Sequence, residues 1–201
     1  MRLKFYINKA LHLLEVMRVI TNNKVVYLTF DDGPDPDITE FVLDALRRYD
    51  FEATFFCCGK NAELHPELLE KIKSEGHTIG NHTYSHIHGF ETPAKVYVND
   101  VQRANQILNA KYFRPPHGAV TLGEFIRLFC KYRIVYWNQP SGDHMESSFD
   151  LCENLIRLKK TTQKGDVVLF HFCHRHENET RQLLPLYLEW LESEGYKSIA
   201  L

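Results

Sequence analysis

The sequence predicts one α/β domain built on a parallel sheet of about seven strands, which is enough to close into a (β/α) barrel. Short apolar runs alternate with amphipathic, helix-like segments from residue 25 to the C-terminus, the pattern of repeated β-α units. No linker, internal repeat or low-complexity stretch interrupts the alternation. The length of 201 residues and the hydrophobic content of 44% suit a single domain with a real core.

The elements follow one another in a regular order. An apolar run predicts a strand at residues 25–30, and apolar residues at helical spacing predict a helix at 39–49. Pro66 and Gly76 mark the two ends of a helix at 66–75, the usual asymmetry of helix termini. Periodicity predicts further helices at 92–110, 121–131, 150–160 and 179–194. Strands are expected at 53–57, 78–80, 112–114, 134–137, 167–172 and 196–200.

Residues 1–23 are expected to form an amphipathic segment ahead of the domain, which spans residues 24–201. The segment carries an apolar stripe at helical spacing, at Ile7, Leu11, Leu14 and Met17. We expect this helix to pack on the domain, while its basic residues leave peripheral contact of residues 1–20 with a membrane open. No secretion signal and no apolar stretch of about 20 residues is visible. A cytoplasmic protein without a transmembrane helix is therefore expected.

Composition narrows the class of partner. The net charge is −2 and no basic stripe is present, which argues against a nucleic-acid groove. The five cysteines form no CxxC pair and are expected to be reduced. The tract at residues 173–176, Cys-His-Arg-His, resembles a metal-binding stretch, but no cysteine pair supports it, so we do not expect a metal site of its own there. We expect a monomer or a weak homo-oligomer.

Two adjacent carboxylates, Asp31 and Asp32, follow the first predicted strand, and a Gly-Pro pair comes next. These residues are also turn formers, but two carboxylates at a buried strand end are costly unless a cation or a donor compensates each. His82 and His86 are four residues apart and can share one ion if their turn is helical. One carboxylate with two imidazoles is the ligand set of a hydrolytic metal centre, and the second carboxylate is then free to act as a base.

Other polar residues fall at the ends of later predicted strands. Arg114 ends the strand at 112–114, before a rigid Pro-Pro turn, and His171 lies near the end of the strand at 167–172. Active sites of (β/α) barrels gather at the carboxyl ends of the strands. We therefore expect Arg114 to reach inward to a carboxylate, and His171 to act as an acid with Asp143 as its partner.

Five motifs in this order resemble the polysaccharide deacetylases, carbohydrate esterase family four with its NodB homology domain. The motifs lie at residues 29–34, 82–86, 114–118, 137–143 and 169–171. The resemblance extends from about Lys24 to the C-terminus. It implies a distorted (β/α) barrel with fewer than eight units. It also implies an enzyme that removes the acetyl group from an N-acetylated sugar, or sometimes an O-acetyl group. The cofactor implied is zinc (Zn²⁺) or another divalent cation such as Co²⁺, Mn²⁺ or Ni²⁺.

The resemblance also assigns roles. The implied metal ligands are Asp32, His82 and His86, and Asp31 is the implied general base that takes a proton from metal-bound water. His171 would protonate the leaving amine, Arg114 would orient Asp31, and Asp143 would tune His171. The backbone amide at His117 would help to bind the oxyanion. The implied substrate-binding residues are Pro116, His117, Gly118, Trp137 and His144.

Two positions depart from the family pattern. His117 stands where an aromatic residue, most often Tyr, is usual, and His144 stands where Trp usually follows the tuning aspartate. In the family both positions tend to shape the sugar site, so the resemblance leads us to expect a preference for small acetylated sugars over long polymers. The alternatives are a non-catalytic carbohydrate-binding relative, an O-acetyl esterase acting on a polysaccharide, or a metal hydrolase of another class such as a phosphatase. Ligands for only one metal argue against the phosphatase.

Overall fold

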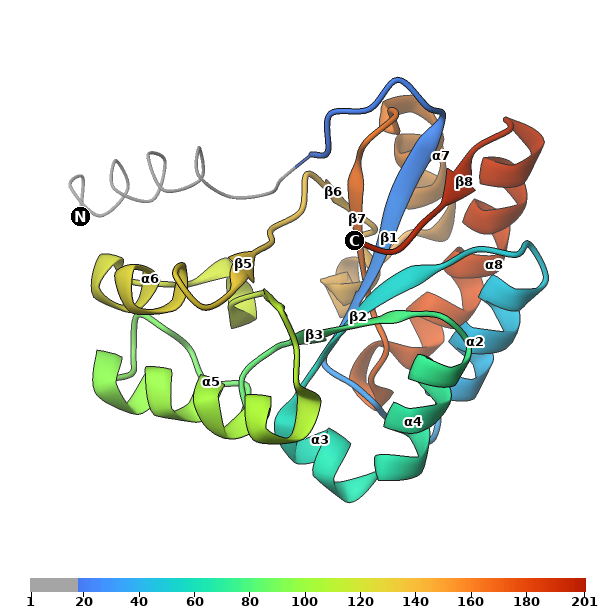
Figure 1. The fold of residues 1–201 in the computed structure, drawn as a ribbon. Coiled ribbons are helices and arrows are strands. Elements are labelled where there is room, and N and C mark those ends of the chain that lie inside the picture. The colour runs from blue at the N-terminus through green and yellow to red at the C-terminus, as the bar shows by residue number, and fades with distance from the viewer. Residues whose placement is uncertain (1–17) are drawn as a thin grey trace.

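Seven strands form the main path of a parallel sheet in the computed structural model, which describes residues 18–201, with only the backbone at residues 146 and 147. Their spatial order is β5-β4-β3-β2-β1-β7-β6 (Figure 1). The strands are β1 Val25–Asp31, β2 Ala53–Cys57, β3 Thr78–Asn81, β4 Tyr112–Phe113, β5 Arg133–Ile134, β6 Gln139–Pro140 and β7 Val167–His171. All of their pairings are parallel. Their carboxyl ends therefore share one edge of the sheet.

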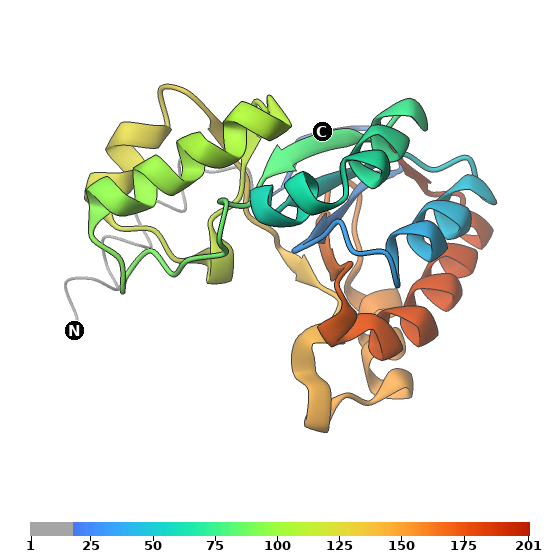
Figure 2. The ribbon, with the colours of Figure 1, turned by 90° about the horizontal axis from the view of Figure 1, so that it is seen from below.

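The sheet curls but does not close. β5 and β6 stand at the two ends of the path and do not pair with each other within residues 18–201, and Figures 1 and 2 show the resulting open barrel. An eighth strand, β8 (Lys197–Ser198), pairs with the start of β1 beside the main path. The predicted distorted (β/α) barrel with about seven parallel strands is confirmed.

The largest error in the predicted strands lies around residue 137. The strand expected at 134–137 is wrong in extent, because β5 ends at Ile134 and a separate strand, β6, begins at Gln139. Strands of two residues leave no periodic pattern in the sequence, and the proline in β6 has no N–H for the sheet. The strands expected at 112–114 and 196–200 are likewise shorter, as β4 and β8.

Seven α-helices in the described residues surround the sheet. They are α2 Thr39–Arg47, α3 Gly59–Leu64, α4 Pro66–Ser74, α5 Ala94–Leu108, α6 Leu122–Leu128, α7 Leu151–Thr161 and α8 Glu177–Ser193. In both ribbon views α5 and α6 lie together on one side, and α7 and α8 lie together on another. Only α3 was not predicted. It has six residues, begins with a glycine, and is separated from α4 by His65 alone, so its pattern merges with that of α4.

Side chains along β1 alternate between the two faces of the sheet. Val26, Leu28 and Phe30 are fully buried in the core that the sheet shares with the helices, where the Phe30 and Phe55 rings stack at 5.1 Å. The intervening residues, Thr29 and Asp31, point to the opposite face, inside the barrel. The strand therefore brings the Asp31 carboxylate into the barrel at its carboxyl end.

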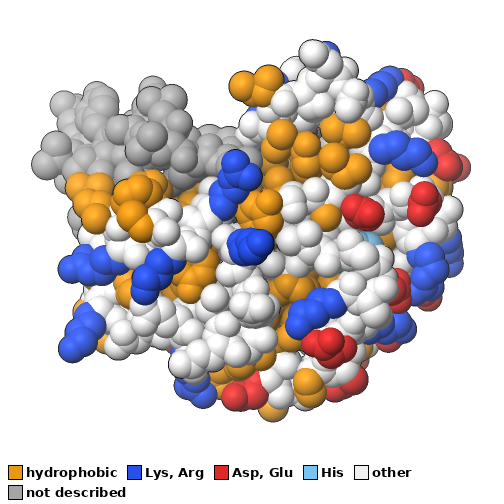
Figure 3. All heavy atoms as spheres, viewed as in Figure 1, with side chains coloured by type: hydrophobic (Ala, Val, Ile, Leu, Met, Phe, Trp, Pro, Cys, Tyr) orange, Lys and Arg blue, Asp and Glu red, His pale blue; other side chains and the backbone are white. Residues whose placement is uncertain are grey.

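The exterior carries mixed charge on the face shown in Figure 3, where hydrophobic side chains also gather over α6. Leu122, Ile126 and Phe129 follow helical spacing there, and 44%, 55% and 51% of their surfaces are exposed. Within residues 18–201, no helix is both long and apolar enough to cross a bilayer.

The first described residues pack on the loop before β7. Val19 donates its backbone N–H to Gly165 O at 2.8 Å, and Arg18 forms an ion pair with Asp166 at 2.6 Å. Residues 1–17 lie outside the described part of the chain. The predicted amphipathic helix and its contact with a membrane fall there and stay predictions.

Candidate active site

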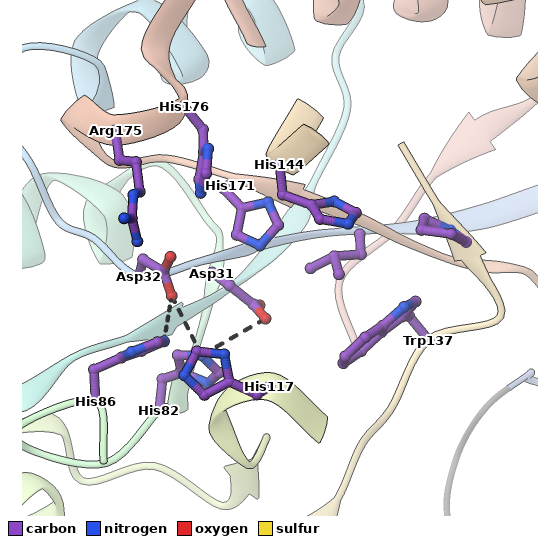
Figure 4. Close-up of a pocket in the computed structure, with 12 residues that line it drawn as sticks. Asp31, Asp32, His82, His86, His117, Trp137, His144, His171, Arg175 and His176 are labelled. Atoms are coloured by element: carbon purple, nitrogen blue, oxygen red, sulfur yellow. Dashed lines mark ion pairs between the residues drawn. The ribbon is translucent and has the colours of Figure 1, made fainter. Parts of the chain in front are cut away.

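A cavity of about 590 Å³ opens at the carboxyl edge of the sheet. Asp31 ends β1 and lies beside His171, which ends β7, because the two are register partners. His82 directly follows β3, and Arg114 directly follows β4. The walls are formed by Asp31, Asp32, His82, His86, His117, Trp137, Pro140, His144, Leu169, His171, Arg175 and His176 (Figure 4). The sequence predicted that the separate motifs would meet at one edge of the sheet, and in the structure they do.

Asp32, His82 and His86 converge on one point. Asp32 Oδ1 lies 3.0 Å from His86 Nε2 and 3.4 Å from His82 Nε2 (Figure 4). His82 Nδ1 lies 2.8 Å from Arg114 O, and a carbonyl only accepts, so Nδ1 carries the hydrogen and Nε2 offers its lone pair to the site. A carboxylate oxygen and two imidazole nitrogens at these separations fit a divalent ion and leave coordination positions open.

The loop that carries the two histidines is not helical, so the helical turn considered for residues 82–86 is wrong. Thr83 and His86 have positive φ, 63° and 54°, a conformation that costs about 1–3 kcal/mol for residues with a side chain. Asp100 from α5 holds the loop by accepting the N–H groups of Tyr84 at 2.7 Å and Ser85 at 3.0 Å. The histidines thus meet through tertiary hydrogen bonds rather than through helical spacing.

Asp32 is also held in a strained backbone conformation, with φ of 85°. Asn61 from α3 donates to Asp32 O at 2.8 Å, and Asp32 N donates to Phe56 O at 3.2 Å. Burial opposes ionisation of Asp32, but the neighbouring His82 and His86 side chains outweigh burial and lower its pKa. Sequence reasoning missed the supporting role of Asn61, because α3 was itself missed.

Arg114 is fully buried and forms an ion pair with Asp31. Its Nη1 donates to Asp31 Oδ1 at 2.7 Å and to Thr29 Oγ1 at 2.8 Å, and its other nitrogens donate to two backbone carbonyls. Burial lowers the pKa of the guanidinium, while the Asp31 charge opposes that change. Asp31 Oδ2 points away from Arg114 and lies 3.8 Å from His82 Nε2. One oxygen of Asp31 is therefore anchored and the other faces the site.

His171 and Asp143 form a second, separate pair. Asp143 Oδ1 accepts from His171 Nδ1 at 2.8 Å, and its Oδ2 accepts from His171 N at 2.7 Å and from Thr180 Oγ1 at 3.0 Å. Burial disfavours the imidazolium, but the Asp143 charge outweighs it and raises the pKa of His171 to about 9. The other ring nitrogen faces the cavity (Figure 4). This arrangement keeps a protonated imidazole beside the site at neutral pH.

The predicted substrate residues separate into two groups. His117, Trp137 and His144 line the cavity, whereas Pro116 is buried in the turn behind it and Gly118 is not among the lining residues. The His117 ring lies 4.8 Å from the His86 ring, and the pKa of His117 is lowered by burial and by neighbouring histidines.

Four lining residues were not predicted as parts of this site: Pro140, Leu169, Arg175 and His176. Pro140 and Leu169 lie within the motifs at 137–143 and 169–171, but as apolar strand residues they were not singled out as parts of the site. Arg175 and His176 belong to the Cys-His-Arg-His tract at residues 173–176. The sequence showed the tract as a possible metal-binding stretch but did not show that it lies beside this cavity. The fold brings the tract to the cavity through the short turn after β7, η4 (His174–His176).

Comparisons with known proteins decide the family. A model of the polysaccharide deacetylases matches residues 18–124. A peptidoglycan-N-acetylglucosamine deacetylase of Bacillus cereus is 32% identical over 189 residues, which cover 90% of this chain and 88% of the relative. The chain belongs to the polysaccharide deacetylase family. It spans 56% and 42% of two longer relatives that are also peptidoglycan-N-acetylglucosamine deacetylases.

Solved structures of polysaccharide deacetylases share this fold. A peptidoglycan N-acetylglucosamine deacetylase in complex with an N-oxidanyl-benzamide is 30% identical, with a TM-score of 0.84 over 92% of this chain and 89% of that one. A family 4 carbohydrate esterase from Streptomyces lividans in complex with acetate is 26% identical, with a TM-score of 0.77 over 88% of this chain and 92% of that one. The family resemblance noted in the sequence is thus confirmed.

Proposed function

We propose that this polysaccharide deacetylase is a metal-dependent hydrolase that removes the acetyl group from an N-acetylated amino sugar. One observation carries the proposal. The adjacent carboxylates Asp31 and Asp32 have different partners, because Arg114 anchors Asp31 while His82 and His86 face Asp32. One carboxylate is thereby assigned to a metal and the other to proton transfer. The alternative of a non-catalytic sugar-binding relative is not favoured, since none of these groups is missing.

Asp32, His82 and His86 are the residues that would hold the ion, and imidazole ligands favour zinc among common divalent ions. When bound, such an ion acidifies water and polarises a carbonyl group. His82 is nearly fully buried and its ring is fixed by the carbonyl of Arg114. This second contact orients the ligand, as hydrogen bonds behind metal sites commonly do.

The remaining residues supply the proton transfers. Asp31 accepts a proton from the water whose oxygen bonds to the acetyl carbonyl carbon, and Arg114 holds the accepting carboxylate in place. His171 donates a proton to the sugar nitrogen as the carbon–nitrogen bond breaks, so that acetate and a free amine leave. The pKa of about 9 keeps His171 protonated before the reaction. Asp143 fixes the tautomer and supports this charge.

The cavity walls favour a short substrate. His144 is exposed at the rim, and Trp137 is the indole ring that lines the cavity. A second large ring at position 144 would add apolar contact area for a stacked sugar chain, and the imidazole of His144 supplies less. We therefore propose that small or lipid-linked acetylated sugars are better substrates than insoluble chitin or intact wall polymer.

The experiment is a screen of acetate release by the purified protein, with the metal varied. N-acetylglucosamine oligomers of increasing length are compared with O-acetyl xylan and with a generic phosphate ester. Release from N-acetyl oligomers that requires a divalent ion supports the proposal, with zinc the preferred ion. The Asp31→Asn protein is the control for contaminating activity. Phosphate release, or acetate release only from xylan, would contradict it.

A further inference from the structure

The two oxygens of Asp32 face different sets of ligands. Oδ1 lies 3.0 Å from His86 Nε2 and 3.4 Å from His82 Nε2, whereas Oδ2 accepts a weak hydrogen bond from Cys173 Sγ at 3.7 Å. Ligand atoms of Asp32, Cys173 and His176 all lie within 4.8 Å of one another. The deacetylation chemistry described above uses Asp32 but gives no role to Cys173 or His176.

We propose that Asp32 Oδ2, Cys173 and His176 form a second metal position, which shares Asp32 with the first and binds zinc or a softer divalent ion such as cadmium. A thiolate, an imidazole and a carboxylate are ligands that zinc accepts, and the thiolate selects soft ions. Ligand atoms around a tetrahedral ion lie about 3.3–3.8 Å apart, given metal–ligand bonds of about 2.0–2.3 Å. The separation of 3.7 Å between Cys173 Sγ and Asp32 Oδ2 already falls in that range.

The surroundings allow an ion to reach this position. Cys173 lines a second hollow of about 220 Å³, while His176 lines the catalytic cavity and Asp32 lines both. The position therefore lies in the wall between two openings. Arg175 lines both as well, and Figure 4 shows Arg175 and His176 on the side of Asp32 away from His86. His176 and His86 thus lie on opposite sides of the Asp32 carboxylate, and Cys173 contacts its Oδ2.

Other groups of possible ligands in the described residues fit an ion less well. In one group, Asp143 and His171 are already hydrogen-bonded to each other, and its third member is His144. The other consists of Asp37, His174 and Glu177, where His174 is 78% exposed. Neither group contains a thiol.

Occupation of the second position has a consequence for activity. A second dication bound to Asp32 would reduce the negative charge that this carboxylate offers to the first ion. It would also lie in the wall of the catalytic cavity close to His171, because the His176 and His171 rings are 4.9 Å apart. We therefore expect zinc or cadmium beyond one equivalent to lower the rate of deacetylation several-fold.

The test is a titration of the metal-free 201-residue chain with Co²⁺ and Cd²⁺. Bound metal is counted after gel filtration, and thiolate-to-metal charge transfer is followed by ultraviolet absorption. The native protein is expected to take up two equivalents, with the charge-transfer band rising as the thiolate site fills. Cys173→Ser should take up one equivalent without the band and should no longer be inhibited by excess metal. Cys152→Ser, which alters an exposed free thiol on α7, is the matched control and should behave as the native protein.

A charge-transfer band that survives in Cys173→Ser would come from another thiol, such as buried Cys58, and would overturn the proposal. A native protein that takes up one equivalent without a band would overturn it as well. Inhibition that persists in Cys173→Ser would overturn the inhibitory role. His82→Ala separates this inference from the proposed function, because it should lose the first site and deacetylation while keeping the charge-transfer band.

Discussion

Replacing Asp143 with Asn is expected to remove the charge that keeps His171 protonated. The pKa of His171 is about 9 in the folded protein, against an ordinary value of 6.5. At pH 8 the imidazole is then about 90% protonated, but only about 3% protonated at the ordinary value. Without the Asp143 charge, burial would lower the pKa of His171, and only the smaller effects of Asp32 and Asp31 would oppose it. We therefore expect the rate on an amide substrate at pH 8 to fall about 30-fold or more if His171 is the acid.

The same change has a pH-dependent effect on stability. The pKa of His171 is higher in the folded chain than in the unfolded chain, so the stabilisation is fully present below about pH 6.5 and is lost as the pH rises through about 9. The difference corresponds to about 3 kcal/mol, since one pKa unit is about 1.4 kcal/mol. In addition, an Asn side chain cannot accept from His171 N, His171 Nδ1 and Thr180 together. At least one of these three donors would lose its acceptor, which lowers the free energy of unfolding by about 1–3 kcal/mol at every pH.

The assays are a pH profile of kcat/KM, an NMR titration of His171 in the metal-free protein, and denaturant unfolding at several pH values. Asp37→Asn is the matched control, because Asp37 forms an exposed pair with His174 at 3.1 Å. That control should leave the alkaline limb of the profile unchanged. If Asp143→Asn folds but its alkaline limb stays at the native pH, the reasoning about this pair is refuted.

Asp31→Asn should lower kcat by about 10²–10⁴ while the metal content stays intact. Asp32→Asn should instead weaken metal binding. Kinetics and metal analysis of both proteins test this, and loss of metal in Asp31→Asn but not in Asp32→Asn would contradict the assigned roles. Arg114→Met leaves the buried Asp31 charge unpaired and should destabilise the fold by about 3–5 kcal/mol. Denaturant unfolding measures this loss, and adding Asp31→Asn should recover part of it; no recovery would mean that the pair is not the cause. His171→Ala should lose more activity on an amide than on an activated ester, whose leaving group needs no proton, and equal losses would make His171 structural. His144→Trp should make kcat/KM rise more steeply with oligomer length, and an unchanged length dependence would contradict the proposed role of this rim position.

Local sequence determined the class of fold because apolar periodicity reports which residues are buried. The strand at residues 25–30, for example, is visible as an apolar run and appears as β1 (Val25–Asp31). The helix expected at 121–131 appears as α6, and its start is capped by Thr121, which accepts from Glu124 N while the Glu124 side chain accepts in return. By contrast, β6 has two residues, and its place follows from pairing with β7 rather than from its own composition.

For the candidate site too, the sequence predicted some features and the tertiary structure decided others. Sequence by itself predicted the chemistry, because a carboxylate pair and a histidine pair at strand ends are residue types suited to metal binding and proton transfer. It also anticipated that Arg114 pairs with a carboxylate and that His171 pairs with Asp143. Both pairs are present in the structure, at 2.7 Å and 2.8 Å.

Only the tertiary structure decided how the two oxygens of each carboxylate are used. Parallel pairing brings the ends of β1 and β7 side by side. A hydrogen bond donated by Asn61 and another accepted by Asp100 hold two strained loops. The two hydrogen bonds join residues that are 29 and 16 positions apart in the chain. Sequence spacing carries no signal for either of them. The same long-range folding placed Cys173 against Asp32, 141 residues earlier in the chain. Residue types therefore fixed which reactions are available, while the closure of distant segments fixed which oxygen faces which partner.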